Sequence, residues 1–197
     1  MTFILGLTGS IGMGKSTTAR LFAEAGCAVW DADAAVHRLY APGGAAVAPM
    51  SKVFPQVIEN GSVSRPLLKR VIAADPTTLQ KVEKIVHPLV AADRERFLSE
   101  VTADIAVLDI PLLYENGSEV MMDAVACVTV SPEVQRARVM ERGTMTPEQF
   151  EAILSKQMPG AEKRARADYV ILTDTLEHAR AQVHSVICDI TQRLIHA

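Results

Sequence analysis

The feature that most constrains this chain of 197 residues is the stretch GLTGSIGMGKST at residues 6–17, which places four glycines and one lysine within twelve positions. The apolar pattern over 2–8 predicts a short buried strand, and the segment from Lys15 to Ala25 has helical spacing. A simple turn needs one or two glycines. Four of them indicate that something approaches this backbone too closely to admit side chains.

The pattern Gly9-x-x-x-x-Gly14-Lys15-Ser16 fits the phosphate-binding loop, and it lies between a strand and a helix as that motif requires. Glycines let successive backbone N–H groups curl into a nest around phosphate oxygens, and the following helix presents its positive end to the same anion. Lys15 would bridge the β- and γ-phosphates, and the Ser16 hydroxyl would ligate Mg²⁺. A glycine-rich turn with an incidental Lys-Ser pair is the alternative. The motif predicts nucleoside triphosphate binding but says little about what is done with the phosphate.

Composition predicts an ordinary globular protein with a cytoplasmic location. Hydrophobic residues make up 49% and charged residues 22% of the chain, and the net charge of −3 gives no basic field for a nucleic-acid partner. The early glycines predict that there is no signal peptide, and the longest later apolar run, over 105–114, is too short to cross a membrane. Cys27, Cys127 and Cys188 lack CxxC spacing and fall in apolar segments, which predicts reduced, buried thiols. We expect a monomer or a weak homo-oligomer.

Short apolar strands alternate with helices, which is typical of a parallel sheet covered on both faces. The predicted strands are 2–8, 27–33, 105–110, 124–130 and 169–172, and later helices are predicted at 132–142, 147–157 and 176–195. Helical periodicity with no clear strand fills 34–104. The prediction is an α/β fold: a P-loop core with a five-stranded parallel sheet, a helical insertion and a small helical lid. Its boundaries are a core at 1–33, 105–131 and 167–197, an inserted domain at 34–104, and a lid at 132–166.

The sequence DAD places Asp31 and Asp33 at the end of the second predicted strand, where neighbouring parallel strands open onto one crevice. A carboxylate there can accept or orient the proton of an acceptor hydroxyl. One of the two acids could instead cap a helix beginning near Ala34. Asp33 is favoured as the base because it lies further from the strand.

Two more elements fit phosphoryl transfer. Arg138 and Arg142 are spaced i, i+4 on one predicted helix face, which could close over a triphosphate or could simply be solvated. Asp109 ends an apolar run like a Walker B strand, so it is either a ligand of Mg²⁺ through water or a buried polar residue. The guanine-recognition motif Asn-Lys-x-Asp of GTPase switches is absent from the sequence.

Seven motifs occur in an order that resembles the dephospho-coenzyme A kinase family over nearly the whole chain. They are LTGSIGMGKST, DAD at 31–33, GSVSRPLLKRVI at 61–72, HPLV at 87–90, IPLLYE at 110–115, QRARVMERG at 135–143 and KRARADYVI at 163–171. DAD, HP and PLLYE are the discriminating pieces. The resemblance implies ATP-dependent phosphorylation of the ribose 3′-hydroxyl of dephospho-CoA, giving CoA and ADP in the final step of coenzyme A biosynthesis. It also implies that 34–104 binds the CoA moiety.

The motif and the resemblance together predict the site residues. The catalytic candidates are Asp33 as base, with Lys15 and Arg138 stabilising the transferred group. The predicted nucleotide-binding residues are Gly9, Ile11, Gly12, Met13, Gly14, Lys15, Ser16, Thr17, Arg138 and Arg142. The predicted substrate-binding residues are Thr8, Asp31, Asp33, Arg65, His87, Pro111, Leu112 and Glu115, and the predicted ligands of Mg²⁺ are Ser16 and Asp109. Without the resemblance, His87 would be interpreted as ending a helix before Pro88.

Other functions remain open at this point. A shikimate-type or nucleoside monophosphate kinase would share the P-loop, but a shikimate kinase lacks a helical insertion of this length and HPLV. A nucleotide-dependent regulatory module would hydrolyse ATP slowly, and no small acceptor would accelerate it. The chain departs from the family in having Thr173 and Thr175 after the last strand, near the expected adenine site.

Overall fold

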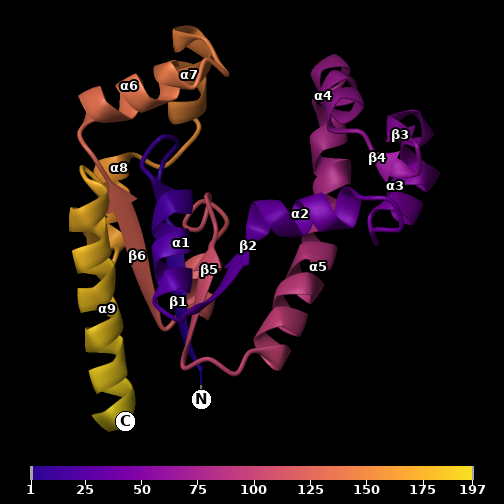
Figure 1. The fold of residues 1–197 in the computed structure, drawn as a ribbon. Helices are drawn as coiled ribbons and strands as arrows, with labels where there is room; N and C mark the ends of the chain where they lie inside the picture. Colours follow the sequence, from indigo (N-terminus) through magenta and orange to yellow (C-terminus); the bar gives the residue numbers. More distant parts are fainter. Residues whose placement is uncertain (1, 197) are drawn as a thin grey trace. The chain divides into compact units, whose positions relative to one another are not determined.

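The computed structural model describes residues 2–196. The chain divides into two compact units, one formed by Met1–Trp30 with Val101–Ala197 and the other by Asp31–Glu100. We call them the sheet unit and the helical unit, and each is described by itself (Figure 1). Among residues 2–196, none of the helices combines the length and the apolar character that a membrane-spanning segment requires.

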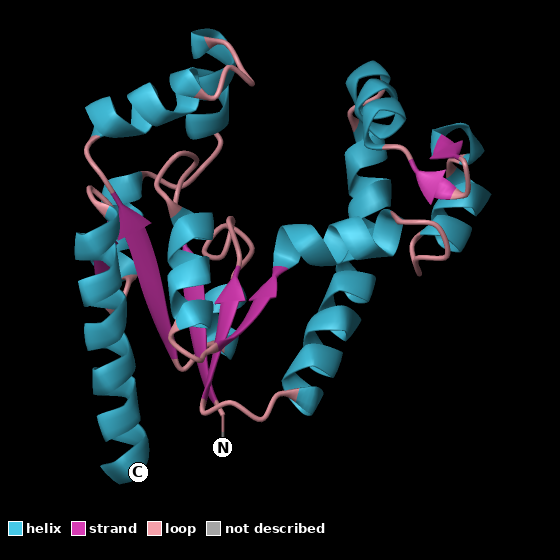
Figure 2. Ribbon diagram, viewed as in Figure 1, coloured by secondary structure: helices cyan, strands magenta, loops and turns pink. Residues whose placement is uncertain are grey.

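The sheet unit is built on five strands in the order β2-β5-β1-β6-β7 (Figure 2). Their bounds are β1 Phe3–Thr8, β2 Ala28–Asp31, β5 Ile105–Asp109, β6 Ala124–Thr129 and β7 Tyr169–Leu172. β1 lies between β5 and β6 and pairs with both in parallel, with Leu7 opposite Asp109 on one side and Ala126 on the other. The predicted α/β fold with a five-stranded parallel sheet is confirmed. Because parallel strands end at the same edge, the carboxyl ends of β1 and β5 lie side by side.

Helices α1 and α9 cover one face of this sheet. α1 is Lys15–Glu24 and α9 is Leu176–His196, and their apolar side chains pack on Leu5, Leu7 and Val107. On the other face Gly6 makes room for the segment after β5, since an added Cβ would come within 2.6 Å of Leu113. The remaining helices are η2 Ser118–Met121, α6 Pro132–Glu141, α7 Pro147–Leu154 and α8 Gly160–Arg166.

The helical unit has its own core. Its elements are α2 Ala32–Tyr40, α3 Val47–Val53, η1 Pro55–Val57, β3 Ile58–Glu59, β4 Ser62–Val63, α4 Arg65–Ala74 and α5 Thr77–Glu100. Met50 and Val57 are fully buried in this core, and Leu68, Val82 and Val86 pack around them. The unit therefore buries enough apolar surface to be a compact body in its own right.

The expectation that 34–104 holds no strand is wrong, because β3 and β4 form an antiparallel hairpin. Asn60 and Gly61 join the two strands with φ angles of 50° and 75°. Positive φ at both central residues matches the type I′ turn that Asn-Gly favours. Each strand has only two residues, so the hydrophobic alternation was too short to detect.

The interpretation of His87 as the end of a helix is also wrong. α5 runs from Thr77 to Glu100 with Pro88 inside it. Proline lacks the N–H that would bond to the carbonyl of Lys84 and normally kinks a helix there. Val82 and Val86, before the proline, are buried in the core of the helical unit, and Leu89 and Val90, just after it, pack against the same core. Packing on both sides of the proline favours continuation of the helix.

The second strand ends earlier than expected, at Asp31 rather than residue 33, and α2 begins at Ala32. The Asp31 carboxylate accepts hydrogen bonds from the backbone N–H groups of Asp33 (2.7 Å) and Ala34 (3.0 Å). Of the two acids, Asp31 is therefore the helix cap, and Asp33 lies in the first turn of α2.

The prediction of three buried thiols holds for two of them. Cys27 and Cys127 are buried, and burial raises the pKa of each to about 11. Cys188 is exposed, because it lies on α9 away from the stripe of Val183, Val186 and Ile190 that packs on the sheet.

Replacing Asp31 with alanine should lower the free energy of unfolding by about 1 kcal/mol, because two N–H groups of α2 lose their acceptor. Asp31→Asn should keep nearly all of the stability, since an asparagine side chain also caps helices. Urea unfolding followed by circular dichroism measures both. Equal stability of the alanine variant and the original chain would contradict the capping role.

Candidate active site

The loop between β1 and α1 has the backbone shape of an anion-binding nest. Gly12 and Gly14 have φ angles of 77° and 87°, which residues with a Cβ rarely adopt. Gly14 is also the N-cap of α1, so the free N–H groups of the first helical turn begin here. The loop can therefore aim successive N–H groups and a positive helix end at one anion.

The protein itself also approaches these glycines closely. A Cβ on Gly9 would lie 2.3 Å from Cγ2 of Val128 in β6, and one on Gly12 would lie 2.6 Å from Cγ2 of Val139 in α6. These distances are far below van der Waals contact. Part of the glycine requirement therefore comes from the packing of β6 and α6 on the loop.

Two glutamines brace the start of the loop. Gln135 of α6 donates to the Ile11 carbonyl (2.7 Å), and the Ile11 amide donates to Gln157 (3.3 Å). Met13 is buried, and its sulfur accepts from the Val130 amide. Ile11 and Met13 were predicted to bind nucleotide. In the structure, the amide and carbonyl of Ile11 and the sulfur of Met13 form hydrogen bonds within the protein. Sequence reasoning missed both glutamines, which lie far along the chain from residue 11.

The P-loop lysine is paired with the acid at the end of β5. The Lys15 ammonium forms an ion pair with Asp109, whose side chain is 1% exposed, while that of Lys15 is 14% exposed. The pairing follows from the register, since β5 lies beside the strand that leads into the P-loop. The structure thus brings together two predicted site residues. Ser16 and Thr17 follow Lys15 in the exposed first turn of α1.

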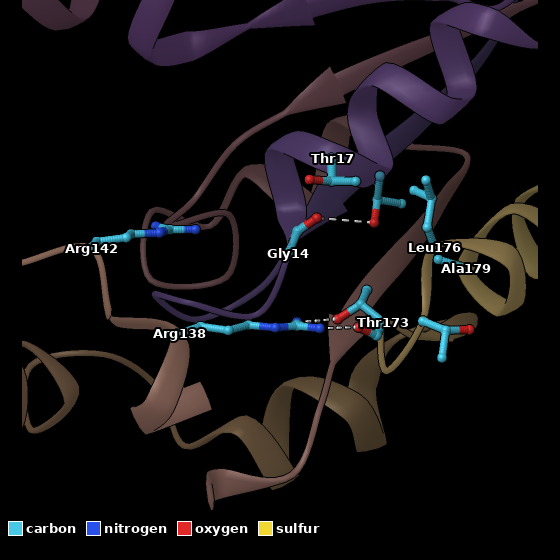
Figure 3. Close-up of a pocket in the computed structure, with 9 residues that line it drawn as sticks. Gly14, Thr17, Arg138, Arg142, Thr173, Leu176 and Ala179 are labelled. Atoms are coloured by element: carbon cyan, nitrogen blue, oxygen red, sulfur yellow. Dashed lines mark hydrogen bonds between the residues drawn. The ribbon is translucent and has the colours of Figure 1, made fainter. Parts of the chain in front are cut away.

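Arg138, on α6, is docked on the segment after β7 (Figure 3). Its guanidinium donates to the Thr173 hydroxyl (3.1 Å), to the Thr173 carbonyl (2.5 Å) and to the Asp174 carbonyl (3.4 Å). The same Thr173 hydroxyl donates to the Met13 carbonyl at 2.7 Å. Thr173 therefore joins the predicted lid arginine to the P-loop, a role that its sequence position did not reveal.

A cavity of about 250 Å³ opens beside Gly14 (Figure 3). It is lined by Gly14, Thr17, Thr18, Arg138, Arg142, Thr173, Thr175, Leu176 and Ala179. Four of these residues were predicted to bind nucleotide. Leu176 and Ala179 of α9 supply an apolar part of the lining, which sequence reasoning missed because the predicted helix over 176–195 carries no binding motif.

Three predicted substrate residues of the sheet unit form a second cluster with Lys163. Thr8 donates to the Pro111 carbonyl (3.1 Å), and Glu115 pairs with the fully buried Lys163 ammonium (2.8 Å). Burial alone would raise the pKa of Glu115, but hydrogen bonds from Lys163 and from the Met158 amide outweigh it, so the pKa lies below its ordinary value. Leu112, in contrast, is partly exposed.

The other predicted substrate residues lie in the helical unit. Arg65 begins α4, and His87 lies midway along α5. His87 and Pro88 line an open hollow of about 490 Å³ together with Gln80, Glu83 and Lys84. Arg38 of α2 donates to Asp93 of α5 at 2.6 Å, and this pair ties the helix that carries Asp33 to the helix that carries His87.

The fold and the site together are those of a P-loop kinase. The parallel sheet has the strand order β2-β5-β1-β6-β7, and the nest, Lys15 and the helix that carries Arg138 lie at the carboxyl ends of its strands. The family model described as dephospho-CoA kinase matches residues 3–178. The chain belongs to the dephospho-CoA kinase family.

Individual relatives agree with the family model. Dephospho-CoA kinase of Ruegeria pomeroyi is 64% identical over 197 residues and covers 100% of both chains. The enzyme of the same name from Cereibacter sphaeroides is 62% identical over 190 residues and covers 96% of both. Among solved structures, TT1252 of Thermus thermophilus has a TM-score of 0.85 at 32% identity, covering 95% of this chain and 97% of that one. Dephospho-CoA kinase from Campylobacter jejuni shares the fold, with a TM-score of 0.67 at 22% identity over 96% and 97%.

The family drawn from the sequence motifs is thus confirmed, and with it the assignment as a kinase that acts in the final step of coenzyme A biosynthesis. The alternative functions, another small-molecule kinase or a regulatory module, are not favoured.

Thr173→Val should lower kcat/KM for ATP roughly tenfold, because the isosteric side chain loses the bond to the Met13 carbonyl and the acceptor for Arg138. Thr173→Ser keeps the hydroxyl and should retain most of the activity. Steady-state ADP release at varied ATP concentration measures both variants. If the valine variant were as active as the original chain, the hydrogen bonds of Thr173 to Met13 and Arg138 would have no effect on catalysis.

Proposed function

We propose that this chain transfers the γ-phosphoryl group of ATP to the 3′-hydroxyl of dephospho-CoA at the P-loop of its sheet unit. The observation that carries this proposal is that Gly14, the last residue of the nest, also lines the cavity bordered by Arg138 and Arg142. An anion site and a partly apolar cavity are thus continuous. Such continuity suits a nucleotide, which has an anionic tail and an apolar base.

In this proposal the base of ATP enters the cavity against Leu176 and Ala179, and the phosphates lie over Gly12, Gly14 and the first turn of α1. The phosphate oxygens compete with Asp109 for the Lys15 ammonium. The Lys15 side chain can change partners because it keeps some exposure at the mouth of the site. Arg138 and Lys15 then stabilise charge on the transferred group.

The residues at this edge fit a magnesium ion. The Ser16 hydroxyl lies in the exposed first turn of α1, and Asp109 contributes a buried carboxylate beside Lys15. Hydroxyl and carboxylate oxygens are the ligands that Mg²⁺ prefers. When bound, the ion neutralises charge on the β- and γ-phosphate oxygens. We propose that Ser16 and Asp109 hold it.

For the acceptor, we propose that Asp33 takes or orients the proton of the 3′-hydroxyl. The Asp31 carboxylate is already used by the N–H groups of α2, which leaves Asp33 for this role. We assign the rest of dephospho-CoA to the helical unit, with Arg65 and His87 as contacts. Lys84 and Glu83 both line the hollow on α5 and offset each other in charge, so the assignment of His87 rests on the motif HPLV and not on the charge of the hollow.

We propose that residues 132–166 act as a lid that excludes water, because an open site would lose ATP to hydrolysis. α6 carries both Arg138, which reaches the nucleotide cavity, and Gln135, which reaches the P-loop. Movement of this one helix would change both contacts together. We expect the enzyme to work in the cytoplasm as a monomer or a weak homo-oligomer.

Asp33→Asn should keep the affinity for ATP and lose most of the turnover, because asparagine cannot accept the hydroxyl proton. A coupled ADP-release assay with dephospho-CoA, adenosine, AMP and shikimate as acceptors tests the substrate with the original chain, and nucleotide titration tests affinity in the variant. Unimpaired turnover in the variant would remove Asp33 from the mechanism. Faster ADP release with another acceptor would overturn the proposed substrate.

Arg138→Ala should lower kcat by about 10³-fold, by analogy with arginines that stabilise transferred phosphoryl groups. Arg136→Ala is the matched control on the same helix, since Arg136 pairs with Glu151 at the surface and lines no part of the cavity. Single-turnover phosphoryl transfer with saturating ATP separates the chemical step from binding. Equal rates for the two variants would contradict the role of Arg138.

A further inference from the structure

Lys163 is a fully buried lysine in the sheet unit that the proposed chemistry leaves unused. Its side chain has no exposed surface. Its ammonium lies 2.8 Å from a Glu115 oxygen and 3.4 Å from the Pro111 carbonyl. A buried ammonium is costly unless it is paired and hydrogen-bonded, and a leucine or methionine would fill the same space without that cost. A lysine here therefore indicates a need for these polar contacts.

The contacts of Lys163 bring together segments that are distant in sequence. The Pro111 carbonyl that faces Lys163 also accepts a hydrogen bond from Thr8, the residue before the P-loop. The Glu115 oxygen that faces Lys163 also accepts from the Met158 amide (2.9 Å). Met158 and Lys163 both lie in the C-terminal part of the segment 132–166 proposed as a lid. The Lys163 ammonium thus connects this part of the chain to the end of β1 and to the loop Pro111–Glu115 after β5.

A second cation of α8, Arg166, also contacts the segment after β5, but its side chain is exposed whereas that of Lys163 is buried. Arg166 donates to Glu119 at 2.8 Å and lies over the Tyr114 ring, 4.7 Å from its centroid. The Arg166 side chain is 42% exposed, however, so solvent screens its ion pair. Lys163 alone of these two cations reaches Pro111 beside the P-loop. Arg166 therefore provides a matched control on the same helix.

We propose that Lys163 is a positioning residue that acts through Pro111 and Glu115 to hold the acceptor side of the active site in register with the P-loop. The proposal rests on the proposed function and on the sequence prediction that Pro111, Leu112 and Glu115 contact dephospho-CoA. Lys163 itself touches no substrate. It keeps the loop at one distance from Thr8, and so keeps the acceptor hydroxyl in line with the phosphate held by the nest.

The test compares Lys163→Met, the double variant Lys163→Met with Glu115→Gln, and the control Arg166→Met. The single variant leaves Glu115 charged without its cation and can fail to fold, whereas the double variant removes both charges together. Circular dichroism melting establishes that each variant is folded at the assay temperature. Steady-state kinetics then give kcat and KM for dephospho-CoA, and nucleotide titration gives the affinity for ATP.

We expect kcat/KM for dephospho-CoA to fall between about 10- and 100-fold in the folded Lys163 variants, because a small misplacement of the acceptor is enough for such a loss. ATP affinity should be unchanged in them, and Arg166→Met should match the original chain in all three measurements. If Lys163 had a purely structural role, its replacement would lower the melting temperature. It would not lower kcat/KM for dephospho-CoA selectively while leaving the affinity for ATP unchanged.

Wild-type acceptor kinetics in the folded Lys163→Met variant would overturn the positioning role while leaving phosphoryl transfer to dephospho-CoA intact. A loss confined to the double variant would also overturn it, because the effect would then belong to the predicted contact of Glu115 with the substrate. An equal loss in Arg166→Met would also overturn it, because the effect would then belong to α8 as a whole. If the unmodified chain releases no ADP with dephospho-CoA, the proposed function itself fails, and the positioning role fails with it.

Discussion

The site depends above all on the direction in which the peptide groups of the P-loop point. In a trans peptide the carbonyl and the following N–H point in opposite directions, so a hydrogen bond that holds one carbonyl also orients the next amide. Gln135 holds the Ile11 carbonyl and Thr173 holds the Met13 carbonyl, which orients the amides of Gly12 and Gly14. Within the P-loop, these are the two glycines with left-handed backbone. The nest is therefore supported in part by side chains from α6 and from the segment after β7.

Two lysine–carboxylate ion pairs lie near the carboxyl end of β5. They differ in how far the lysine side chain is exposed to solvent. Lys15, paired with Asp109, is 14% exposed, while Lys163, paired with Glu115, is 0% exposed. A cation that must exchange a carboxylate for a phosphate needs a route to the ligand, and partial exposure gives Lys15 that route. A cation that must hold two segments at one distance works best where no competing ligand or water reaches it. In the proposed function, a lysine–carboxylate pair would thus bind substrate at one position and, as we infer for Lys163, hold two segments together at the other.

The sequence predicted what is encoded locally. The P-loop, the strands and most helices follow from residue patterns within a few positions, and the family follows from motif order. The hairpin at Asn60-Gly61 was missed because its strands are too short to show alternation, and α5 passes through Pro88 because tertiary packing outweighs a local helix breaker. Gln135 and Thr173 could not be assigned, because their partners in the P-loop lie 124 and 160 residues away. Polar residues of this kind acquire a role only when the fold brings their partners to them.

Arg138 shows why an arginine suits the predicted lid. Its planar guanidinium donates at once to the Thr173 hydroxyl, the Thr173 carbonyl and the Asp174 carbonyl, a set of oxygens that a single ammonium matches poorly. These oxygens border the cavity assigned to the nucleotide, so phosphate oxygens would offer the same fork a second and more strongly charged set of acceptors. Thr173 also orients the Gly14 amide. If Arg138 moved from Thr173 to the phosphates, the hydrogen bonding of Thr173 would change, and with it the orientation of the Gly14 amide in the nest. In the proposed function, movement of Arg138 would then be coupled to the shape of the anion site through the Thr173 hydroxyl.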